Sequence, residues 1–157
     1  MSSKAKHYDG LIKLLRSKRL QQTNGEKMAL NDPLGAAFSK ISNAELIGNK
    51  ECYLKFSSKL MKNIFNAMKD NSYIGEYEEI PDSRGTLLKV NLLGNINKCG
   101  VIKPRYSVKL ADYERYEKRY LPAKGFGYLF VSTSQGILTH IEAKKKKLGG
   151  RLMAFVY

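Results

Sequence analysis

Val131-Ser132-Thr133-Ser134-Gln135-Gly136 places three consecutive hydroxyl side chains, an amide and a glycine at the end of an apolar run, and we call this stretch the hydroxyl turn. The apolar run from Tyr128 to Val131 predicts a strand. Hydroxyl groups donate and accept hydrogen bonds without carrying charge, and the glycine lets the backbone bend or approach another surface closely. Such a bend suits the shallow minor groove of folded RNA, which displays ribose hydroxyls and base edges. Similar turns also occur in proteins that bind nothing there, so the interpretation depends on the surrounding residues.

Positive charge lies on both sides of the hydroxyl turn in the sequence. Lys103 and Arg105 precede it, and four lysines at residues 144–147 follow it. The chain of 157 residues carries a net charge of +14. The basic side chains repel one another unless a polyanion neutralises them, so a nucleic acid or an anionic membrane surface is the expected partner.

The charge divides the sequence into three segments. Residues 1–31 form a basic N-terminal extension with 7 basic and 2 acidic side chains, residues 32–96 are neutral with 8 of each, and residues 97–157 carry 13 basic and 4 acidic side chains. The hydrophobic fraction of 43% supports globular folding, at a length that suits two small domains. We therefore predict an N-terminal domain at 32–96 and a C-terminal RNA-binding β domain at 97–157.

Membrane and disulfide chemistry are not expected. No apolar stretch approaches the length needed to span a bilayer, and the N-terminus lacks the apolar core of a signal peptide. Cys52 and Cys99 stand alone, outside metal-binding or redox spacing, and are expected to be reduced thiols.

The N-terminal extension leaves three interpretations open. Its apolar residues recur at helical spacing among basic ones, at Leu11, Ile12, Leu14 and Leu15. They fit a short amphipathic helix, a tail that becomes ordered only on its partner, or a membrane-surface segment. The basic C-terminal segment favours RNA as that partner.

Residues 32–93 predict the order α-β-α-β-β. Asp32-Pro33 starts a helix, with an N-cap carboxylate before a proline, and the helix should stop near Gly48. Residues 51–56 alternate as a strand, Ser58 caps a second helix, and strands at 73–80 and 86–93 flank a turn at 81–85. The expected buried positions are Leu34, Ala37, Phe38 and Ile41 on the first helix, Cys52, Leu54 and Phe56 on the strand, and Leu60, Met61, Ile64, Phe65 and Met68 on the second helix.

Charged residues also lie on the surfaces of these elements. Lys59, Lys62 and Lys69 lie off the buried stripe, where they either reach phosphates or are only solvated. Glutamates at 76, 78 and 79 give the predicted hairpin an acidic rim, which is an unsuitable RNA surface.

Residues 97–157 predict a mostly antiparallel β domain. A strand over 100–108 is interrupted by Pro104, which indicates an edge strand or a bulge. After the hydroxyl turn the chain returns as a strand, and Thr139 caps a short helix through Lys147 with Glu142 as its capping-box partner. Gly149-Gly150 ends this helix, and residues 151–157 form the last strand.

Residues 111–120 leave two interpretations open. Tyrosines at 113, 116 and 120 alternate with Arg115, Lys118 and Arg119, so they can stack on bases while the cations pair with phosphates. Alternatively the tyrosines pack a short helix on the sheet with their hydroxyls outward, which is favoured for Tyr113 and Tyr116.

An enzyme is the competing class of function. Ser134, His140 and Glu142 form a conceivable catalytic set. No GxSxG motif surrounds the serine, and the flanking charge favours a polyanion, so we predict a non-enzyme with no cofactor, no metal and no small-molecule substrate.

From Asp32-Pro33-Leu34 to Tyr157 the sequence resembles the small-subunit ribosomal protein eight family. The hydroxyl turn, Gly149-Gly150-Arg151-Leu152 and Tyr73-Ile74-Gly75-Glu76 carry the resemblance. Asn97-Lys98-Cys99-Gly100-Val101-Ile102-Lys103-Pro104-Arg105-Tyr106 and Arg119-Tyr120-Leu121-Pro122 are closer to its archaeal and eukaryotic branch.

The resemblance implies an α+β fold of two small domains, α-β-α-β-β followed by a mostly antiparallel β domain with a short helix. It implies a cytoplasmic, structural constituent of the small ribosomal subunit. Such a protein binds the central domain of small-subunit ribosomal RNA, contacts neighbouring ribosomal proteins and helps to assemble the platform. The alternative is a translational regulator that binds a messenger RNA mimicking the ribosomal stem.

The resemblance also implies which residues bind RNA. The hydroxyl turn would make the central contacts with RNA, and the stretch around Lys103 would make supporting contacts. The glycine pair would allow a close approach to the RNA, and the start of the second helix would contact the RNA backbone. These residues are Ser132, Thr133, Ser134 and Gly136; Lys103, Arg105 and Tyr106; Gly149 and Gly150; and Ser58 and Lys59, to which the basic stretches add Arg119 and Lys144. The sequence departs from the family at Arg151, where bacterial members usually have glutamate, and at Gly94-Asn95-Ile96, which replaces a more basic stretch.

Overall fold

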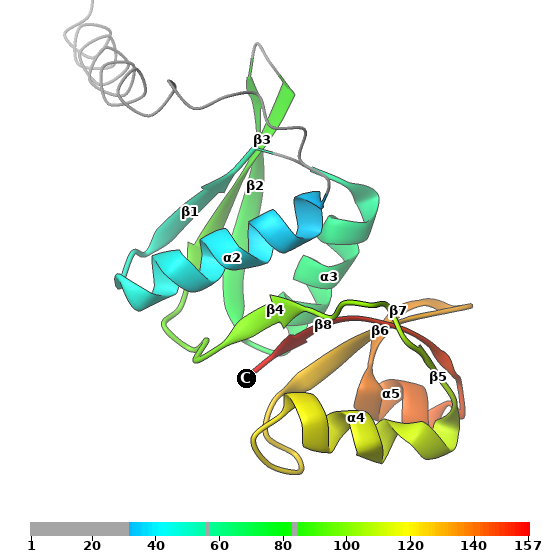
Figure 1. Cartoon of the computed structure of the whole chain (residues 1–157). Coiled ribbons are helices and arrows are strands. Elements are labelled where there is room, and N and C mark those ends of the chain that lie inside the picture. The colour runs from blue at the N-terminus through cyan, green and yellow to red at the C-terminus, as the bar shows by residue number, and fades with distance from the viewer. Residues whose placement is uncertain (1–31, 56, 83–84) are drawn as a thin grey trace, which may run out of the picture. The chain divides into compact units, whose positions relative to one another are not determined.

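The computed structural model describes residues 32–55, 57–82 and 85–157, which have an α+β fold (Figure 1). Their strands form a three-stranded antiparallel sheet followed by a five-stranded antiparallel sheet, each accompanied by helices. This confirms the predicted fold class. The helix and membrane-surface interpretations of residues 11–15 and the role of the N-terminal extension lie outside the described residues. Within the described part of the chain, no helix is long and apolar enough to cross a membrane.

The first half follows the predicted order. It contains α2 (Pro33–Leu46), β1 (Glu51–Leu54), α3 (Lys59–Asp70), β2 (Ile74–Asp82) and β3 (Gly85–Leu92), with the strands in the order β1-β3-β2. Each helix buries one apolar face, because its buried residues recur three and four positions apart. The buried positions are Leu34, Ala37, Phe38 and Ile41 on α2 and Met61, Ile64, Phe65 and Met68 on α3, as predicted; Leu60 is half-buried, and Phe56 lies outside the described residues.

The hairpin between β2 and β3 is tighter than predicted. Pro81 pairs with Thr86 and Asp82 with Gly85, so strand pairing extends into the turn predicted for residues 81–85. The order β1-β3-β2 makes β2 an edge strand of this sheet. A proline is tolerated there because its missing N–H need not serve a further strand.

The second half is built around β8 (Gly150–Val156). β4 (Cys99–Val101), β5 (Ser107–Val108) and β6 (Tyr128–Thr133) all pair with β8, and β7 (Gly136–Thr139) pairs with β6. The single strand predicted over 100–108 is therefore two strands. The predicted interruption at Pro104 is confirmed, since this residue lies in the gap between them.

Two helices cover one face of the five-stranded sheet. A 3-10 turn (Leu110–Asp112) leads into α4 (Tyr113–Tyr120), and α5 (His140–Lys145) follows β7. Figure 1 shows both helices on the same side of the sheet. Thr139 caps α5 in the predicted capping box: its hydroxyl accepts from the Glu142 amide at 3.3 Å, and the Glu142 carboxylate accepts from the Thr139 amide at 3.1 Å. The helix ends at Lys145, slightly earlier than predicted.

Two hydrophobic clusters form the core. The smaller one lies between the five-stranded sheet and α4 and α5. The larger one joins the two halves, because it combines side chains of α2, α3 and the three-stranded sheet with Phe130, Met153 and Val156 from the five-stranded sheet. The domain boundary between residues 96 and 97 stays a prediction. The larger hydrophobic cluster contains residues from both sides of it.

Both cysteines are buried and free, in agreement with the expected thiols. Burial raises the pKa of the Cys99 thiol to about 12 and also raises the pKa of Cys52. Since the thiolate is the reactive form, neither side chain is a reactive thiol at neutral pH.

Candidate nucleic-acid interface

The hydroxyl turn runs from the end of β6 into a two-residue hairpin turn on the molecular surface. Thr133 pairs with Gly136 at the end of the β6-β7 ladder, which leaves Ser134 and Gln135 as the turn. All three residues from Ser134 to Gly136 are exposed. Gly136 has a φ of +114°, a backbone conformation that favours glycine, and no atom of the described residues lies within 4 Å of the position that a side-chain carbon would take. The turn is therefore open to a partner.

The three hydroxyl groups have different surroundings. The Thr133 hydroxyl donates to the Gly136 carbonyl at 2.9 Å and accepts from the Gln135 amide at 3.2 Å, so it holds the turn together. Ser134 is exposed, and its hydroxyl has no hydrogen bond to any other described residue. Ser132 is half-buried in the strand. Of the three, Ser134 is the hydroxyl most available to a ligand.

Ser132 belongs to a row of polar side chains across three strands. It lies opposite Arg151 of β8, and Arg151 lies opposite Ser107 of β5. Residues directly opposite each other in an antiparallel pair project from the same face of the sheet. Arg151 and Ser107 are exposed. In the sequence Arg151 stands out only as a departure from the resembled family and Ser107 carries no signal, because their alignment with Ser132 depends on the strand register.

The glycine pair lies close to the protein's own backbone, while its predicted close approach to RNA stays a prediction. A side-chain carbon on Gly150 would lie 2.3 Å from the Ser132 carbonyl oxygen, and one on Gly149 would lie 2.8 Å from the Val108 carbonyl oxygen. Both glycines therefore allow β8 to pack closely against its neighbours. Their small size is explained without an RNA contact.

Lys103 and Arg105 are exposed cations with different partners. The Lys103 ammonium lies 2.6 Å from the Asp32 carboxylate, whereas an Arg105 nitrogen lies 3.5 Å from the Met153 sulfur. Asp32 occupies the predicted N-cap position of α2, but its side chain makes no capping hydrogen bond and pairs with Lys103 instead. Burial acts to raise the pKa of Asp32, but neighbouring groups that lower it, Lys103 first and also Arg105, outweigh burial and the pKa is lowered. Asp32 therefore remains ionised and neutralises part of the charge that Lys103 would offer a phosphate.

Tyr106 lies against two residues of α4, Arg119 and Tyr116. The Arg119 guanidinium lies 5.6 Å from the centre of the Tyr106 ring, and the Tyr106 and Tyr116 rings are 5.5 Å apart. Tyr106 and Tyr116 are half-buried, and Arg119 is exposed. Tyr113 is fully buried, and its hydroxyl donates to the Leu148 carbonyl at 2.9 Å. The packing interpretation is therefore right for Tyr113, but its hydroxyl points inward rather than outward.

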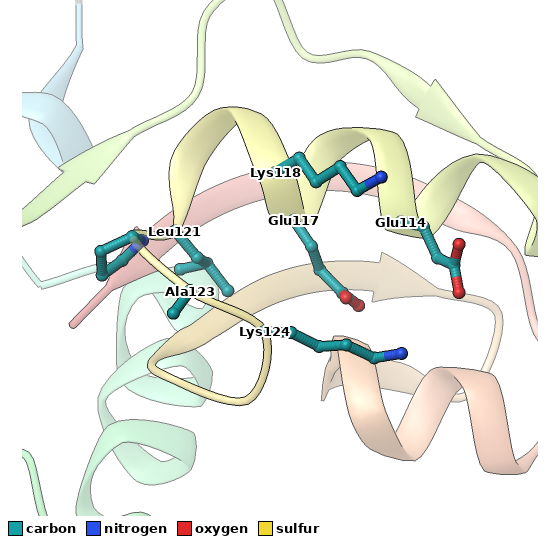
Figure 2. Close-up of a pocket in the computed structure, with 7 residues that line it drawn as sticks. Glu114, Glu117, Lys118, Leu121, Ala123 and Lys124 are labelled. Carbon is teal, nitrogen blue, oxygen red and sulfur yellow. The ribbon is translucent and has the colours of Figure 1, made fainter.

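Lys144 is engaged inside the protein. Its ammonium pairs with the Glu117 carboxylate and lies 6.0 Å from the Tyr113 ring. Figure 2 shows Glu117 extending from α4 into a pocket of about 280 Å³ beside the loop that contains Ala123 and Lys124. Glu117 is buried, so Lys144 compensates a carboxylate that water does not reach freely. Its role in stabilising this pair is distinct from its predicted RNA contact.

The catalytic set considered from the sequence is not assembled. The His140 Nδ1 accepts from the Leu129 amide at 3.1 Å, and its Nε2 lies 3.4 Å from a Glu117 oxygen. The Glu142 carboxylate is held by the Thr139 amide in the capping box. Both nitrogens of His140 already face partners, so neither is free to serve as a base. In addition, Ser134 lies on the exposed turn whereas His140 is buried.

The start of α3 has a structural role of its own. The Ser58 hydroxyl accepts from the Met61 amide at 3.2 Å, which confirms the predicted cap, and Lys59 is exposed beside it. Further along α3, Lys62 lies 2.5 Å from Glu79 and Lys69 lies 3.2 Å from Glu76. These two lysines neutralise the acidic rim of the hairpin rather than forming a free basic surface.

Metal chemistry has no support within the described residues, where no cluster of histidine, cysteine, aspartate or glutamate side chains suits a metal ion. The chain was compared with protein-family models. The model described as Ribosomal protein S8 matches residues 32–157, which is the whole chain apart from the N-terminal extension.

Proposed function

Because the chain belongs to the ribosomal protein S8 family, we propose that it binds the central domain of small-subunit ribosomal RNA and helps to assemble the platform of the subunit. Family membership makes it a structural, non-catalytic protein of the small ribosomal subunit in the cytoplasm, with ribosomal RNA and neighbouring ribosomal proteins as partners. The finer proposal names the RNA domain, the assembly role and the residues that make the contact.

The exposed hydroxyl turn is the observation that carries this proposal. It presents the exposed Gly136 and the Ser134 hydroxyl, which has no hydrogen bond to another described residue, on a segment with 13 basic and 4 acidic side chains. Uncharged hydroxyls match the ribose and base edges of a folded stem, while the surrounding cations supply affinity for phosphates. We assign Ser132, Ser134 and Arg151 to the stem itself, with Thr133 shaping the turn.

Supporting contacts come from the remaining residues that the sequence predicts to bind RNA. Arg105 has no carboxylate partner among the described residues, so it offers a full charge to a phosphate. Lys103 contributes less, because Asp32 already neutralises it in part. Tyr106, Arg119 and Lys59 are assigned to the periphery of this surface. We assign Ser58, Gly149, Gly150 and Lys144 structural roles that maintain it.

The test separates the contribution of the hydroxyl turn to recognition of the stem from the contribution of positive charge to affinity for any RNA. Ser134→Ala should weaken binding to the cognate stem by about 1–3 kcal/mol, because a polar group of the RNA is left unpaired, and should change binding to unrelated RNA little. Arg105→Ala should weaken binding to both RNAs and flatten the dependence of the logarithm of the affinity on the logarithm of salt concentration by roughly one unit. Filter binding at several salt concentrations measures both effects.

Matched controls use exposed residues of the first half. Ser39→Ala removes a hydroxyl from α2, and Lys50→Ala removes a charge after α2, both at exposed positions. Ser39→Ala should weaken stem binding less than Ser134→Ala does, and Lys50→Ala less than Arg105→Ala does. Equal losses for Ser134→Ala on cognate and unrelated RNA would contradict the assigned role of the turn.

A further inference from the structure

A continuous row of rings crosses from the loop after α4 to the end of β8 and back to α4. The Phe126 and Tyr157 rings are 6.5 Å apart, Tyr157 and Phe155 are 6.2 Å apart, and Phe155 and Tyr120 are 5.7 Å apart. The Arg119 guanidinium continues the row, at 5.5 Å from the Tyr120 ring and 5.6 Å from the Tyr106 ring. We call this set the aromatic row; it comprises Phe126, Tyr157, Phe155, Tyr120, Arg119 and Tyr106.

The fold brings this row together from distant parts of the sequence. Phe155 and Tyr157 are two residues apart at the end of β8, so their side chains project from the same face. Tyr120 of α4 stacks on the Phe155 ring with an interplanar angle of 28°, and Arg119 of α4 lies over the Tyr120 ring. A side-chain carbon on Gly100 of β4 would lie 3.0 Å from the Phe155 ring, so the glycine lets this ring lie close against the backbone. The rings are thus held in place before any ligand binds.

The row remains accessible. Phe126 is 51% exposed, Arg119 is exposed, and the remaining members are half-buried. An exposed phenylalanine next to further rings is costly in water and indicates a surface that a partner covers.

The charge around the row selects the kind of partner. None of its six members is a carboxylate, and Arg119 has no ion pair within the described part of the chain. Lys124 is exposed two residues before Phe126. The Lys98 amide donates to the Tyr157 carbonyl at 2.8 Å, so this exposed lysine lies near the same end of the row, while Arg119 supplies the charge toward the Tyr106 end. Rings interleaved with cations suit unpaired nucleobases, which stack on aromatic faces and guanidinium planes while phosphates meet the cations.

From this geometry we infer that the aromatic row is a second RNA-binding surface, which stacks the unpaired bases of a single-stranded segment. It differs from the hydroxyl turn in chemistry, because stacking tolerates any base whereas the turn fits a folded stem. The inference rests on the proposed function in taking RNA as the partner. The two can be tested separately, because one binds a stem and the other an unpaired strand.

The first experiment measures binding of the full chain to oligouridylate and to an abasic oligomer of equal length, at one salt concentration. The abasic oligomer keeps the phosphates and lacks the bases. The chain should bind oligouridylate roughly tenfold more tightly, as expected for base–aromatic stacking. Phe126→Leu keeps an apolar side chain but removes the ring, so it should reduce this difference severalfold and leave abasic binding unchanged.

A second experiment reports on stacking directly. The chain contains no tryptophan, so Phe126→Trp introduces a single indole into the row, which is excited selectively at wavelengths that the ten tyrosines do not absorb. Oligouridylate should quench its emission, and the abasic oligomer should not. Leu46→Trp, at a position 78% exposed on α2, serves as the matched control and should not be quenched.

Binding to the ribosomal stem provides the remaining arm. If the stem binds but oligouridylate and the abasic oligomer bind equally, the proposed function stands and the inference is overturned. The inference is also overturned if Phe126→Leu leaves oligouridylate binding intact while Phe126→Ala impairs incorporation into the small subunit, since the row would then face a protein. Failure of stem binding, with stacking retained, would count against the proposed function alone.

Discussion

At the scale of single residues, the buried imidazole of His140 links three elements. Its Nδ1 accepts from the Leu129 amide of β6, and its Nε2 faces Glu117 of α4, while His140 itself begins α5. Burial lowers the pKa of His140, and although Glu117 acts to raise this pKa, Lys144 acts to lower it and the net shift is downward from 6.5. The histidine is therefore neutral in the folded protein at neutral pH.

This pKa shift predicts a loss of stability on acidification. The unfolded chain binds a proton near pH 6.5, whereas the folded chain binds it only at lower pH, so stability is fully present above 6.5 and falls as pH drops below that value. The slope should reach at most about 1.4 kcal/mol per pH unit for one group. Urea unfolding at pH 8 and pH 5.5 measures the difference. His140→Asn, whose carbonyl can accept from the Leu129 amide, should lose less stability than the natural chain; an equal loss would exclude His140 as the cause.

At the scale of elements, the pairing of β8 with β6 depends on Gly150. The Ser132 carbonyl lies 2.3 Å from the position of an added side-chain carbon, and a backbone group cannot rotate away. Gly150→Ala should therefore cost about 3 kcal/mol of stability, at the upper end for overpacking, and should weaken stem binding by displacing Ser132. Gly94→Ala is the control: Gly94 has open space but a φ of +81°, so strain alone should cost about 1 kcal/mol with RNA affinity unchanged. Denaturant unfolding and stem binding of both variants decide between these effects.

The elements that sequence predicted best are those specified by local chemistry. Caps at Ser58 and Thr139 act within three residues, so the starts of α3 and α5 were predictable. The position of the hydroxyl turn was likewise predictable from an apolar run followed by polar residues. Features that depend on contacts between residues far apart in the sequence could not be predicted. They include the ion pairs of Lys103 and Lys144 and the division of residues 100–108 into β4 and β5, which both pair with β8. Which hydroxyl of the turn is free depends on the Thr133–Gly136 register, and no local pattern specifies it.

At the scale of the whole molecule, the shared core couples the two predicted domains. Phe130 of β6 is fully buried in the same cluster as Phe38 of α2 and Phe65 of α3. Separate domains would each close their own core, whereas here removing the five-stranded sheet would expose the apolar faces of α2 and α3. The two sheets of residues 32–157 should therefore unfold in one cooperative transition.

Phe130→Ala tests this coupling. Loss of the ring should lower the free energy of unfolding by about 3–5 kcal/mol, because it leaves a cavity in the shared cluster. Native-state hydrogen exchange should then show equal losses of protection for the slowest amides of β3 and of β8, although Phe130 belongs to neither strand. Lys50→Ala, at an exposed position, should change neither set. If the β3 amides kept their protection in Phe130→Ala while those of β8 lost theirs, the two halves would unfold independently. The basic half would then be stable enough to bind RNA without support from the neutral half.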